Sequence, residues 1–188
     1  MELAKEAAAK DKILVLSLSA PFIPLAFKDA LAAAFPYVDY VLGNDSEAAA
    51  FAQAFQLGTE DLKDIAKHIA NMPKENSKRK RVAIVTRGTD ATLVAIQGED
   101  EVKEYPVHVI NKEDIKDTTG AGDAFAGGLC AGILGGKTLS QSIDIGQWLA
   151  SLTLSAVGPT YVASVHLSPF AAVPGHREKH HIVFACLL

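Results

Sequence analysis

The sequence predicts an α/β fold in which helices cover both faces of a mainly parallel sheet. Short apolar runs of strand length alternate with longer helical patterns along most of the chain, and this alternation is typical of parallel sheets. The 188 residues are 49% hydrophobic and 21% charged, which is enough apolar material for one sizeable core. The glycines are concentrated in one stretch, because seven of 14 lie between Gly120 and Gly136.

The first part of the chain is expected to supply two strands and their helices. In chain order, we expect an alanine-rich helix over 2–12, a strand over 13–18, a helix over 24–34, a strand over 37–42, a helix from Glu47, and an amphipathic helix over 60–71. Asp45 or Ser46 is expected to cap the helix that begins at Glu47, because both residue types accept hydrogen bonds from free backbone N–H groups.

The second part of the chain is expected to complete the sheet and to add two helices. In chain order, we expect a buried strand over 81–86, a partner strand over 92–96, an outer strand over 102–110, the glycine-rich turn, a helix ending near Leu134, and a last helix over 139–156. Ligands in such sheets bind beyond the carboxyl ends of the strands. Asn44, Thr86 and Gly120 are each expected to follow a strand, so the sequence predicts that they line one cleft.

Composition excludes several classes of protein. The net charge of −4 argues against bulk nucleic-acid binding, and no apolar run is long enough to cross a bilayer. Cys130 and Cys186 are too few for a disulfide framework or a zinc site, which favours a reducing, cytoplasmic setting, and the charged N-terminus predicts no secretory signal. The basic run 74–81 has two interpretations, a nuclear import signal and a solvated loop, and the loop is favoured. The histidines of the tail are expected to be solvated.

The glycine turn is the strongest functional signal. Gly120 and Gly122 lack a Cβ, so the backbone can turn tightly and approach a ligand. The following helix would present free N–H groups and the positive end of its dipole, an arrangement that attracts phosphate. Asp123 lies in the first turn of that helix, where the dipole favours its ionised form, so it is a candidate proton acceptor. The alternative interpretation is a tight loop followed by close helix packing.

A second candidate site follows the strand over 37–42. Asn44 and Glu47 are one helical turn apart, and a carboxylate at this place can hold Mg²⁺ against phosphates. Two other interpretations remain open, a helix-capping motif and a glycosylation sequon at Asn44-Asp45-Ser46. For Thr86-Arg87-Gly88, which follows a buried strand, a plain hairpin turn is the alternative.

The string from Asp117 to Phe125, Asp-Thr-Thr-Gly-Ala-Gly-Asp-Ala-Phe, resembles the C-terminal signature of the ribokinase-like carbohydrate kinases, the PfkB family. The resemblance implies a ribokinase-like fold, an anion hole at Gly120, Ala121 and Gly122, and Asp123 as the catalytic base. It also implies that Asn44-x-x-Glu47 organises phosphate and magnesium, with Glu47 as the metal-binding residue. Thr86 and Gly88 match the Thr-x-Gly element that lines the ATP phosphate site.

Further blocks are similar to the adenosine kinase branch of that family: Leu18-Ser19-Ala20-Pro21-Phe22-Ile23, Pro36-Tyr37-Val38-Asp39, Gly43-Asn44-Asp45-Ser46-Glu47-Ala48, Asn76-Ser77-Lys78-Arg79 and Gly146-Gln147-Trp148-Leu149-Ala150. The resemblance implies transfer of the γ-phosphoryl of ATP to the 5′-hydroxyl of adenosine, giving AMP, with Mg²⁺ required. ATP and adenosine are then the expected partners. No nucleic acid, membrane or obligate protein partner is implied.

The sequence departs from the family pattern in three places. Ser17 stands where the family usually has Asn. The resemblance ends near Tyr161, so we expect a kinase domain over 1–161 and a divergent tail over 162–188 that lies outside the core. The N-terminal lid half of the family is not matched, which predicts that the 188 residues are inactive alone. A sugar kinase of the same superfamily and a non-catalytic nucleotide-binding fragment are the alternatives.

Overall fold

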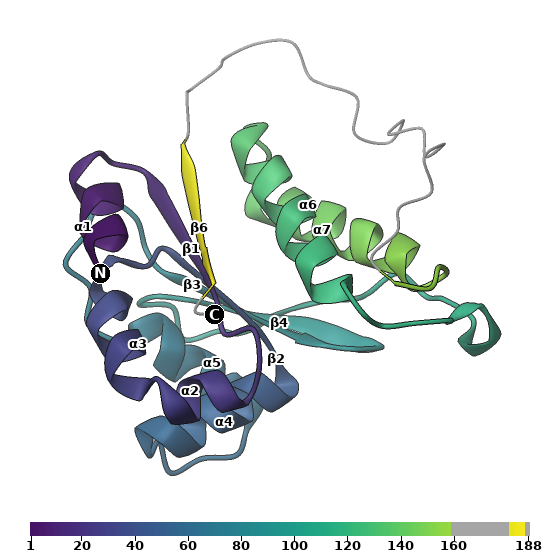
Figure 1. Cartoon of the computed structure of the whole chain (residues 1–188), viewed down its shortest axis with the longest axis horizontal. Helices are drawn as coiled ribbons and strands as arrows, with labels where there is room; N and C mark the ends of the chain where they lie inside the picture. Colours follow the sequence, from purple (N-terminus) through teal and green to yellow (C-terminus); the bar gives the residue numbers. More distant parts are fainter. Residues whose placement is uncertain (159–180, 187–188) are drawn as a thin grey trace. The chain divides into compact units, whose positions relative to one another are not determined.

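A computed structural model describes residues 1–158 and 181–186 (Figure 1). The chain divides into two compact units. The sheet unit comprises Met1–Pro106 together with the C-terminal residues from His181, and the helical unit begins at Val107. We describe each unit by itself.

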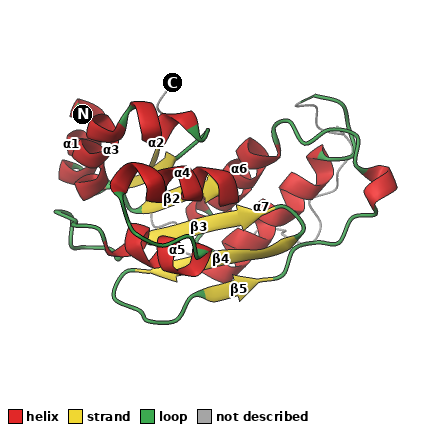
Figure 2. Cartoon of the chain, turned by 90° about the horizontal axis from the view of Figure 1, so that it is seen from below, coloured by secondary structure: helices red, strands yellow, loops and turns green. Residues whose placement is uncertain are grey.

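The sheet unit is built on a six-stranded sheet in the order β5-β4-β3-β2-β1-β6. Its strands are β1 (Ile13–Ser17), β2 (Tyr40–Asn44), β3 (Val82–Arg87), β4 (Asp90–Ile96), β5 (Lys103–Tyr105) and β6 (Ile182–Cys186). The pairs β6–β1, β1–β2 and β2–β3 are parallel, whereas β3–β4 and β4–β5 are antiparallel. Figure 2 shows β2, β3, β4 and β5 side by side. The predicted α/β fold with a mainly parallel sheet is confirmed.

The helices of this unit pack their apolar faces onto one side of the sheet. They are α1 (Glu2–Ala9), α2 (Phe22–Ala26), α3 (Lys28–Ala34), α4 (Asp45–Phe55) and α5 (Leu62–Asn71), with a 3-10 turn at Phe35–Tyr37. Alternate strand residues such as Leu14 and Leu16 join Phe51, Ile65 and Ile69 in one buried cluster. The period of two in the strands and of three to four in α5 explains which residues enter the core.

Several predicted elements have different bounds in the structure, and three of the differences have a clear local description. The helix expected over 24–34 is two helices, α2 and α3, that meet at Phe27. The strand expected over 37–42 begins only at Tyr40, because Pro36 starts a 3-10 turn before it. The outer strand expected over 102–110 is limited to Lys103–Tyr105, since Pro106 follows and has no N–H to donate to a ladder.

Arg81 is buried, although its sequence context is a basic run. Its side chain is 0% exposed, and its guanidinium donates to five backbone carbonyl oxygens, those of Val38 (3.2 Å), Ile69 (3.3 Å), Met72 (2.6 Å), Phe35 (2.5 Å) and Pro73 (3.1 Å). Burial lowers the pKa of Arg81 to about 10, and the charge of Asp39 opposes that shift. The guanidinium therefore stays charged at neutral pH inside the protein.

Lys74 begins the same basic run and is also buried. Its Nζ lies 2.7 Å from Asp39 Oδ1, with side-chain exposures of 3% and 1% for the two residues. Lys74 also donates to the carbonyl oxygen of Arg79, at 2.5 Å. A solvated loop is therefore the wrong interpretation for Lys74 and Arg81. Neither side chain is available to a receptor as part of an import signal.

The helical unit pairs α6 (Ala121–Leu134) with α7 (Leu139–Thr153), after a 3-10 turn at Lys112–Asp114. Three glycines allow the two helices to touch. A Cβ on Gly128 would lie 2.8 Å from Gly146 Cα, and one on Gly132 would lie 2.7 Å from Ser142 Cα. Close helix packing thus accounts for Gly128, Gly132 and Gly146. Within residues 1–158 and 181–186, no helix has the length and apolar character needed to cross a membrane.

The C-terminal strand differs from our expectation for the tail. Ile182–Cys186 pairs with β1 in parallel register and contributes Val183 and Ala185 to the packing around the core. The expectation that the tail lies outside the core is therefore wrong for these residues. The rest of the predicted tail, 162–180 and 187–188, lies outside the described residues, as does Tyr161 at its boundary.

Candidate functional site

The carboxyl ends of β2 and β3 bring three of the predicted residues together. Asn44 and Thr86 are register partners on these adjacent parallel strands, and Glu47 lies in the first turn of α4, which begins directly after β2. The Thr86 hydroxyl donates to the carbonyl oxygen of Gly43, at 3.5 Å. Gly88 follows in the turn between β3 and β4, with φ +58°. Asn44, Glu47 and Thr86 therefore form one group at the expected edge of the sheet.

Asn44 and Glu47 form a reciprocal capping box at the start of α4. The Asn44 side-chain oxygen accepts the N–H of Glu47 (2.9 Å), and Glu47 Oε2 accepts the N–H of Asn44 (3.0 Å). Asn44 Nδ2 also donates to Glu47 Oε1, at 2.9 Å. Asn44 is thus the N-cap, and the assignment of the cap to Asp45 or Ser46 is wrong. Strand β2 delivers Asn44 in the extended conformation that an N-cap needs.

Glu47 is a buried carboxyl group whose charged form is disfavoured by desolvation. It is 7% exposed, and desolvation raises its pKa, with a further rise from the charge of Asp45. The hydrogen bond from the Asn44 backbone opposes the rise without cancelling it. A carboxylate in this setting is stabilised by a nearby positive charge. The capping interpretation is correct for Glu47, and the site also fits a cation.

Two neighbouring residues behave differently from the simplest expectation. Arg87 does not stand free, because its Nε donates to the Ala91 carbonyl oxygen (2.8 Å) and its Nη2 lies 3.4 Å from Glu104. Ser17, the residue that replaces the family's usual Asn, accepts the N–H of Ser19 at 3.2 Å. Ser19 has φ +64°, so Ser17 supports a tight, unusual turn after β1.

Gly43 is a site residue that sequence reasoning missed. A Cβ at this position would lie 2.9 Å from Leu18 Cδ1 and 3.3 Å from Glu47 Oε2. A larger residue would therefore press on the Leu18 side chain and on the Glu47 carboxylate, and glycine avoids both contacts. The sequence signal is the glycine directly before Asn44, in the block Gly43-Asn44-Asp45-Ser46-Glu47-Ala48.

The glycine turn lies in the helical unit and leaves the N-terminus of α6 open. Gly120 is the N-cap, with φ +83°, and no side chain caps the helix. Ala121 N–H donates to Thr118 O at 3.3 Å, whereas the N–H groups of Gly122 and Asp123 have no hydrogen-bond partner among residues 1–158 and 181–186. Both residues are exposed, and a Cβ on Gly122 would meet nothing within 4 Å. Free donors and free space thus coincide there.

Asp117 is a second residue whose role the sequence did not show. Its Oδ1 accepts the N–H of Thr119 and its Oδ2 accepts the N–H of Gly158, both at 2.9 Å. These bonds lower its pKa, that from Thr119 most strongly. Lys116 N–H also donates to Leu154 O, at 2.8 Å. Asp117 therefore ties the start of the glycine turn to the chain that follows α7.

The predicted residues fall into two groups, one in each unit. Asn44, Glu47, Thr86 and Gly88 belong to the sheet unit, and the turn from Gly120 to Asp123 belongs to the helical unit. The expectation that Gly120 directly follows a strand is wrong, because a 3-10 turn at Lys112–Asp114 lies between β5 and the glycine turn. That both groups line one cleft stays a prediction.

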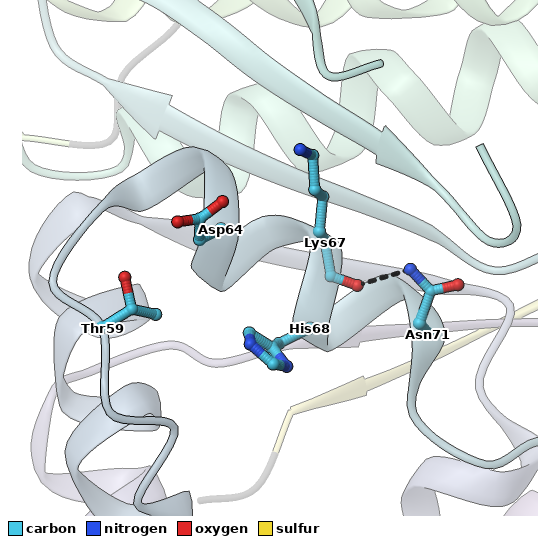
Figure 3. Close-up of a pocket in the computed structure, with 5 residues that line it drawn as sticks. All are labelled: Thr59, Asp64, Lys67, His68 and Asn71. Carbon is cyan, nitrogen blue, oxygen red and sulfur yellow. Dashed lines mark hydrogen bonds between the residues drawn. The ribbon is translucent and has the colours of Figure 1, made fainter. Parts of the chain in front are cut away.

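A separate hollow of about 380 Å³ lies beside α5 and is lined by Thr59, Asp64, Lys67, His68 and Asn71 (Figure 3). The Asn71 side chain is engaged there, since Nδ2 donates to Lys67 O and Oδ1 accepts the N–H of Gly98, both at 2.9 Å. No residue predicted for the functional site lines this hollow, so the candidate site remains at the two groups above.

Several known proteins are similar to most of this chain, and the relatives named here are adenosine kinases. The chain is 44% identical to an adenosine kinase of Saccharomyces cerevisiae over 163 residues, which are 86% of this chain and 46% of the relative. It is 38% identical over 157 residues to adenosine kinase 1 of Arabidopsis thaliana, covering 84% of this chain and 45% of the relative. The chain spans about half the length of the relatives it matches.

Solved structures of adenosine kinases are also similar to this chain. An Anopheles gambiae adenosine kinase in complex with P1,P4-di(adenosine-5) tetraphosphate is 46% identical, with a TM-score of 0.81 over 84% of this chain and 46% of that one. A Schistosoma mansoni adenosine kinase in complex with adenosine and AMP is 30% identical, with a TM-score of 0.78 over 86% of this chain and 47% of that one. The family model that matches residues 1–165 is that of the pfkB carbohydrate kinases, and the chain belongs to this family.

Proposed function

We propose that the chain supplies the ATP-binding and phosphoryl-transfer part of an adenosine kinase, which phosphorylates the 5′-hydroxyl of adenosine to give AMP. The observation that carries the proposal is the open N-terminus of α6. Two free backbone N–H groups, a left-handed glycine and an exposed carboxylate occur together there, inside the family signature. Its relatives named above are adenosine kinases, and two of them were solved with adenosine or a diadenosine compound.

The glycine turn is suited to the charge that develops on a phosphoryl group during transfer. Phosphoryl transfer depends mainly on positioning and on electrostatic stabilisation of the equatorial oxygens. N–H groups at a helix N-terminus supply that stabilisation without reorganisation, because the helix already fixes their direction. We assign this role to Gly120, Ala121 and Gly122. The engagement of Ala121 N–H with Thr118 O makes Gly122 the stronger donor of the two.

Asp123 is assigned as the general base. Its carboxylate is exposed in the first turn of α6, and no described residue donates a hydrogen bond to it. It is therefore available to accept the proton of the attacking hydroxyl.

Glu47 is assigned to a magnesium ion that accompanies ATP, with Asn44, Thr86 and Gly88 at the phosphates. Burial disfavours the charge of its carboxylate and raises its pKa, so a cation beside it would stabilise the ionised form. Within the described residues, no group of three or more His, Cys, Asp or Glu side chains is placed to hold a metal by itself. The ion would thus share Glu47 with phosphate oxygens and water, as Mg²⁺ commonly does in nucleotide sites. When bound, it would neutralise phosphate charge.

The test joins the 188-residue chain to the part of the Saccharomyces cerevisiae adenosine kinase that its match leaves uncovered, in the order of that enzyme. ADP release is measured with and without adenosine. We expect adenosine-dependent release that falls at least about a hundredfold in Asp123→Asn, which removes the base and keeps its size. ATP affinity should be the same in both proteins.

Two outcomes would contradict the proposal. The first is a folded fusion that binds ATP and transfers nothing, since the donor part comes from an adenosine kinase and only this chain would be at fault. The second is transfer to sugars but not to adenosine, by the fusion or by the unfused chain assayed beside it. The unfused chain is expected to show no transfer, because substrate positioning can contribute roughly 7–11 kcal/mol to lowering the barrier.

A further inference from the structure

Strand β1 has the character of an interior strand. Ile13, Leu14, Val15 and Leu16 are all buried, and Val15 is 0% exposed. Such an uninterrupted apolar run is typical of strands inside parallel sheets, whereas edge strands usually alternate or carry charges. An interior strand needs hydrogen-bond partners along both edges, because its backbone N–H groups point alternately to the two sides.

The two edges of β1 are satisfied by different parts of the chain. On the β2 side, Leu14 N–H donates to Asp39 Oδ2 (2.9 Å) and Leu18 N–H donates to Leu42 O (2.8 Å). On the other side, Ile13 N–H donates to His181 O (2.9 Å), and the register continues in parallel to the pair Ser17–Cys186. Even-numbered N–H groups of β1 therefore face β2, and odd-numbered ones face β6.

The partner on the second edge lies outside the part of the chain that matches the kinase family. The family match ends at residue 165, and β6 begins at Ile182. Among the described residues, the family part thus gives β1 one neighbour, β2, and β6 provides the other. Val183 and Ala185 pack against the core cluster, while Phe184 is 44% exposed. β6 itself has the mixed burial of an edge strand.

We propose that the outer edge of β1 is a strand-binding surface, and that residues 182–186 of the same chain are its occupant. The surface takes a short apolar segment that runs parallel to β1 and offers one N–H and one C=O for each pair of residues. β6 keeps this edge from pairing with a second copy of the chain, because an uncovered apolar edge is a template for association. This inference is independent of the catalytic proposal.

Amide hydrogen exchange of the full chain, resolved by residue, tests the proposal within β1 itself. If β6 occupies the edge, the amides of Ile13, Val15 and Ser17 are protected to about the same degree as those of Leu14 and Leu16. The latter face β2 and report that the sheet is folded. Rapid exchange of Ile13 and Val15 beside slow exchange of Leu14 and Leu16, in the unaltered chain, would overturn the proposal.

Two proline variants provide a matched pair. The alternation of a parallel ladder turns the N–H groups of Val183 and Ala185 toward β1, and those of Ile182 and Phe184 away from it. Ala185→Pro removes a donor to β1, whereas Phe184→Pro removes one that faces the open side, where proline is tolerated. We expect exchange of Ile13 and Val15 to rise by roughly tenfold or more in Ala185→Pro only, as for a locally opened edge.

Light scattering on the same variants tests the second part of the proposal. Ala185→Pro should self-associate, and Phe184→Pro should keep the mass of the unaltered chain. Equal exchange in both variants would overturn the assignment of β6 as the occupant. An exposed β1 edge without self-association would overturn the role of a second copy. Continued protection of Leu14 and Leu16 ensures that neither result reflects a failure to fold.

Discussion

Helix α4 follows strand β2 directly and helix α6 follows the glycine turn, and the N-termini of the two helices are completed in opposite ways. At α4, the side chains of Asn44 and Glu47 take the free backbone groups in a reciprocal pair. At α6, Gly120 has no side chain to offer, and the N–H groups of Gly122 and Asp123 have no partner among the described residues. An extended N-cap with a polar side chain therefore produces a closed end at α4, and a left-handed glycine produces an open end at α6.

The two helix N-termini therefore suit ligands of opposite charge. At the closed end, side chains accept the N–H groups of Asn44, Ser46 and Glu47, so its chemistry belongs mainly to the buried Glu47 carboxylate and suits a cation. The open end has donors and space but no fixed charge other than Asp123, and so it suits an anion. A phosphoryl-transfer site needs both kinds of end.

We expect the greatest loss of activity when the carboxylate at the open end is removed. Asp123→Asn in the fused enzyme should reduce turnover at least about a hundredfold, because an amide cannot accept the proton. Asp45→Asn is the matched control, since Asp45 is an exposed acid in the first turn of the closed end. Turnover is measured by ADP release. Equal losses in the two variants would mean that the charge near a helix N-terminus, and not its identity as a base, is what matters.

A smaller effect breaks the geometry of the open end. Gly120→Ala forces a side chain into φ +83° and should lose about 1–2 kcal/mol of unfolding free energy, together with ATP affinity. Gly127→Ala is the control within α6, because a Cβ there meets nothing within 4 Å. It should gain about 0.5–1 kcal/mol, as for other exposed helix glycines. Urea unfolding of both variants checks the signs, and a tolerated Gly120→Ala would contradict the turn.

The closed end can be compared with a second capping box that lies outside the site. Thr138 and Gln141 cap α7 in the same reciprocal way as Asn44 and Glu47 cap α4. Asn44→Ala and Thr138→Ala should each lose roughly 1 kcal/mol of unfolding free energy. Only Asn44→Ala should also raise the ATP and magnesium concentrations needed for activity. If both variants leave the nucleotide response unchanged, Asn44 is a cap and nothing more.

The smallest expected effect concerns pH, and its sign differs between the two ends. The pKa of Glu47 is raised above 4.5, so its contribution to stability is full below 4.5 and is lost as pH rises through the folded value. The pKa of Asp117 is lowered below 3.8, so its contribution is full above 3.8 and is lost as pH falls through the folded value.

Unfolding of Glu47→Gln and Asp117→Asn across that range tests these signs. Relative to the unaltered chain, the unfolding free energy of Glu47→Gln should increase as pH rises above 4.5. That of Asp117→Asn should be lower above pH 3.8 than below it. Parallel pH profiles for the two variants would contradict the opposite electrostatics of the two ends.

The fold was largely predictable from the sequence because it depends on local patterns. The apolar run 13–16 and the spacing of Ile65 and Ile69 indicate a strand and a helix without knowledge of their neighbours. β6 was not predicted because periodicity alone cannot assign a five-residue apolar run to a strand or a helix. Its partner strand also lies far away in the chain. The helix cap was misplaced because three adjacent residues, Asn44, Asp45 and Ser46, are all good caps.

The grouping of three candidate residues was predictable from the sequence, whereas their interactions were less so. Asn44, Glu47 and Thr86 do meet at one edge of the sheet, as the motif order indicated. The hydrogen bond from Gly158 to Asp117 joins residues 41 positions apart. The side chain of Leu18 limits the space at Gly43, and these two residues are also far apart in the sequence. Neither interaction therefore has a local sequence signature. Whether both groups of site residues face one ligand depends on how the two units meet, and no pattern within either unit determines this.

Arg81 has a consequence for the order in which the sheet unit assembles. Its five acceptors come from the 3-10 turn after α3, the approach to β2, and the end of α5, segments well separated along the chain. A buried guanidinium with only some of these partners would be strongly unfavourable, because an ion loses its hydration on burial. We therefore expect its bonds to form only after those segments have met, which is late in folding.

We therefore expect the loss of Arg81 to raise the unfolding rate more than it lowers the folding rate. Interactions that are absent from the transition state change mainly the unfolding rate when they are removed. A residue at the junction of a basic surface loop and a buried strand thus controls how long the sheet unit remains assembled once formed. The lifetime of the platform that presents Asn44, Glu47 and Thr86 depends on a side chain that contacts none of them.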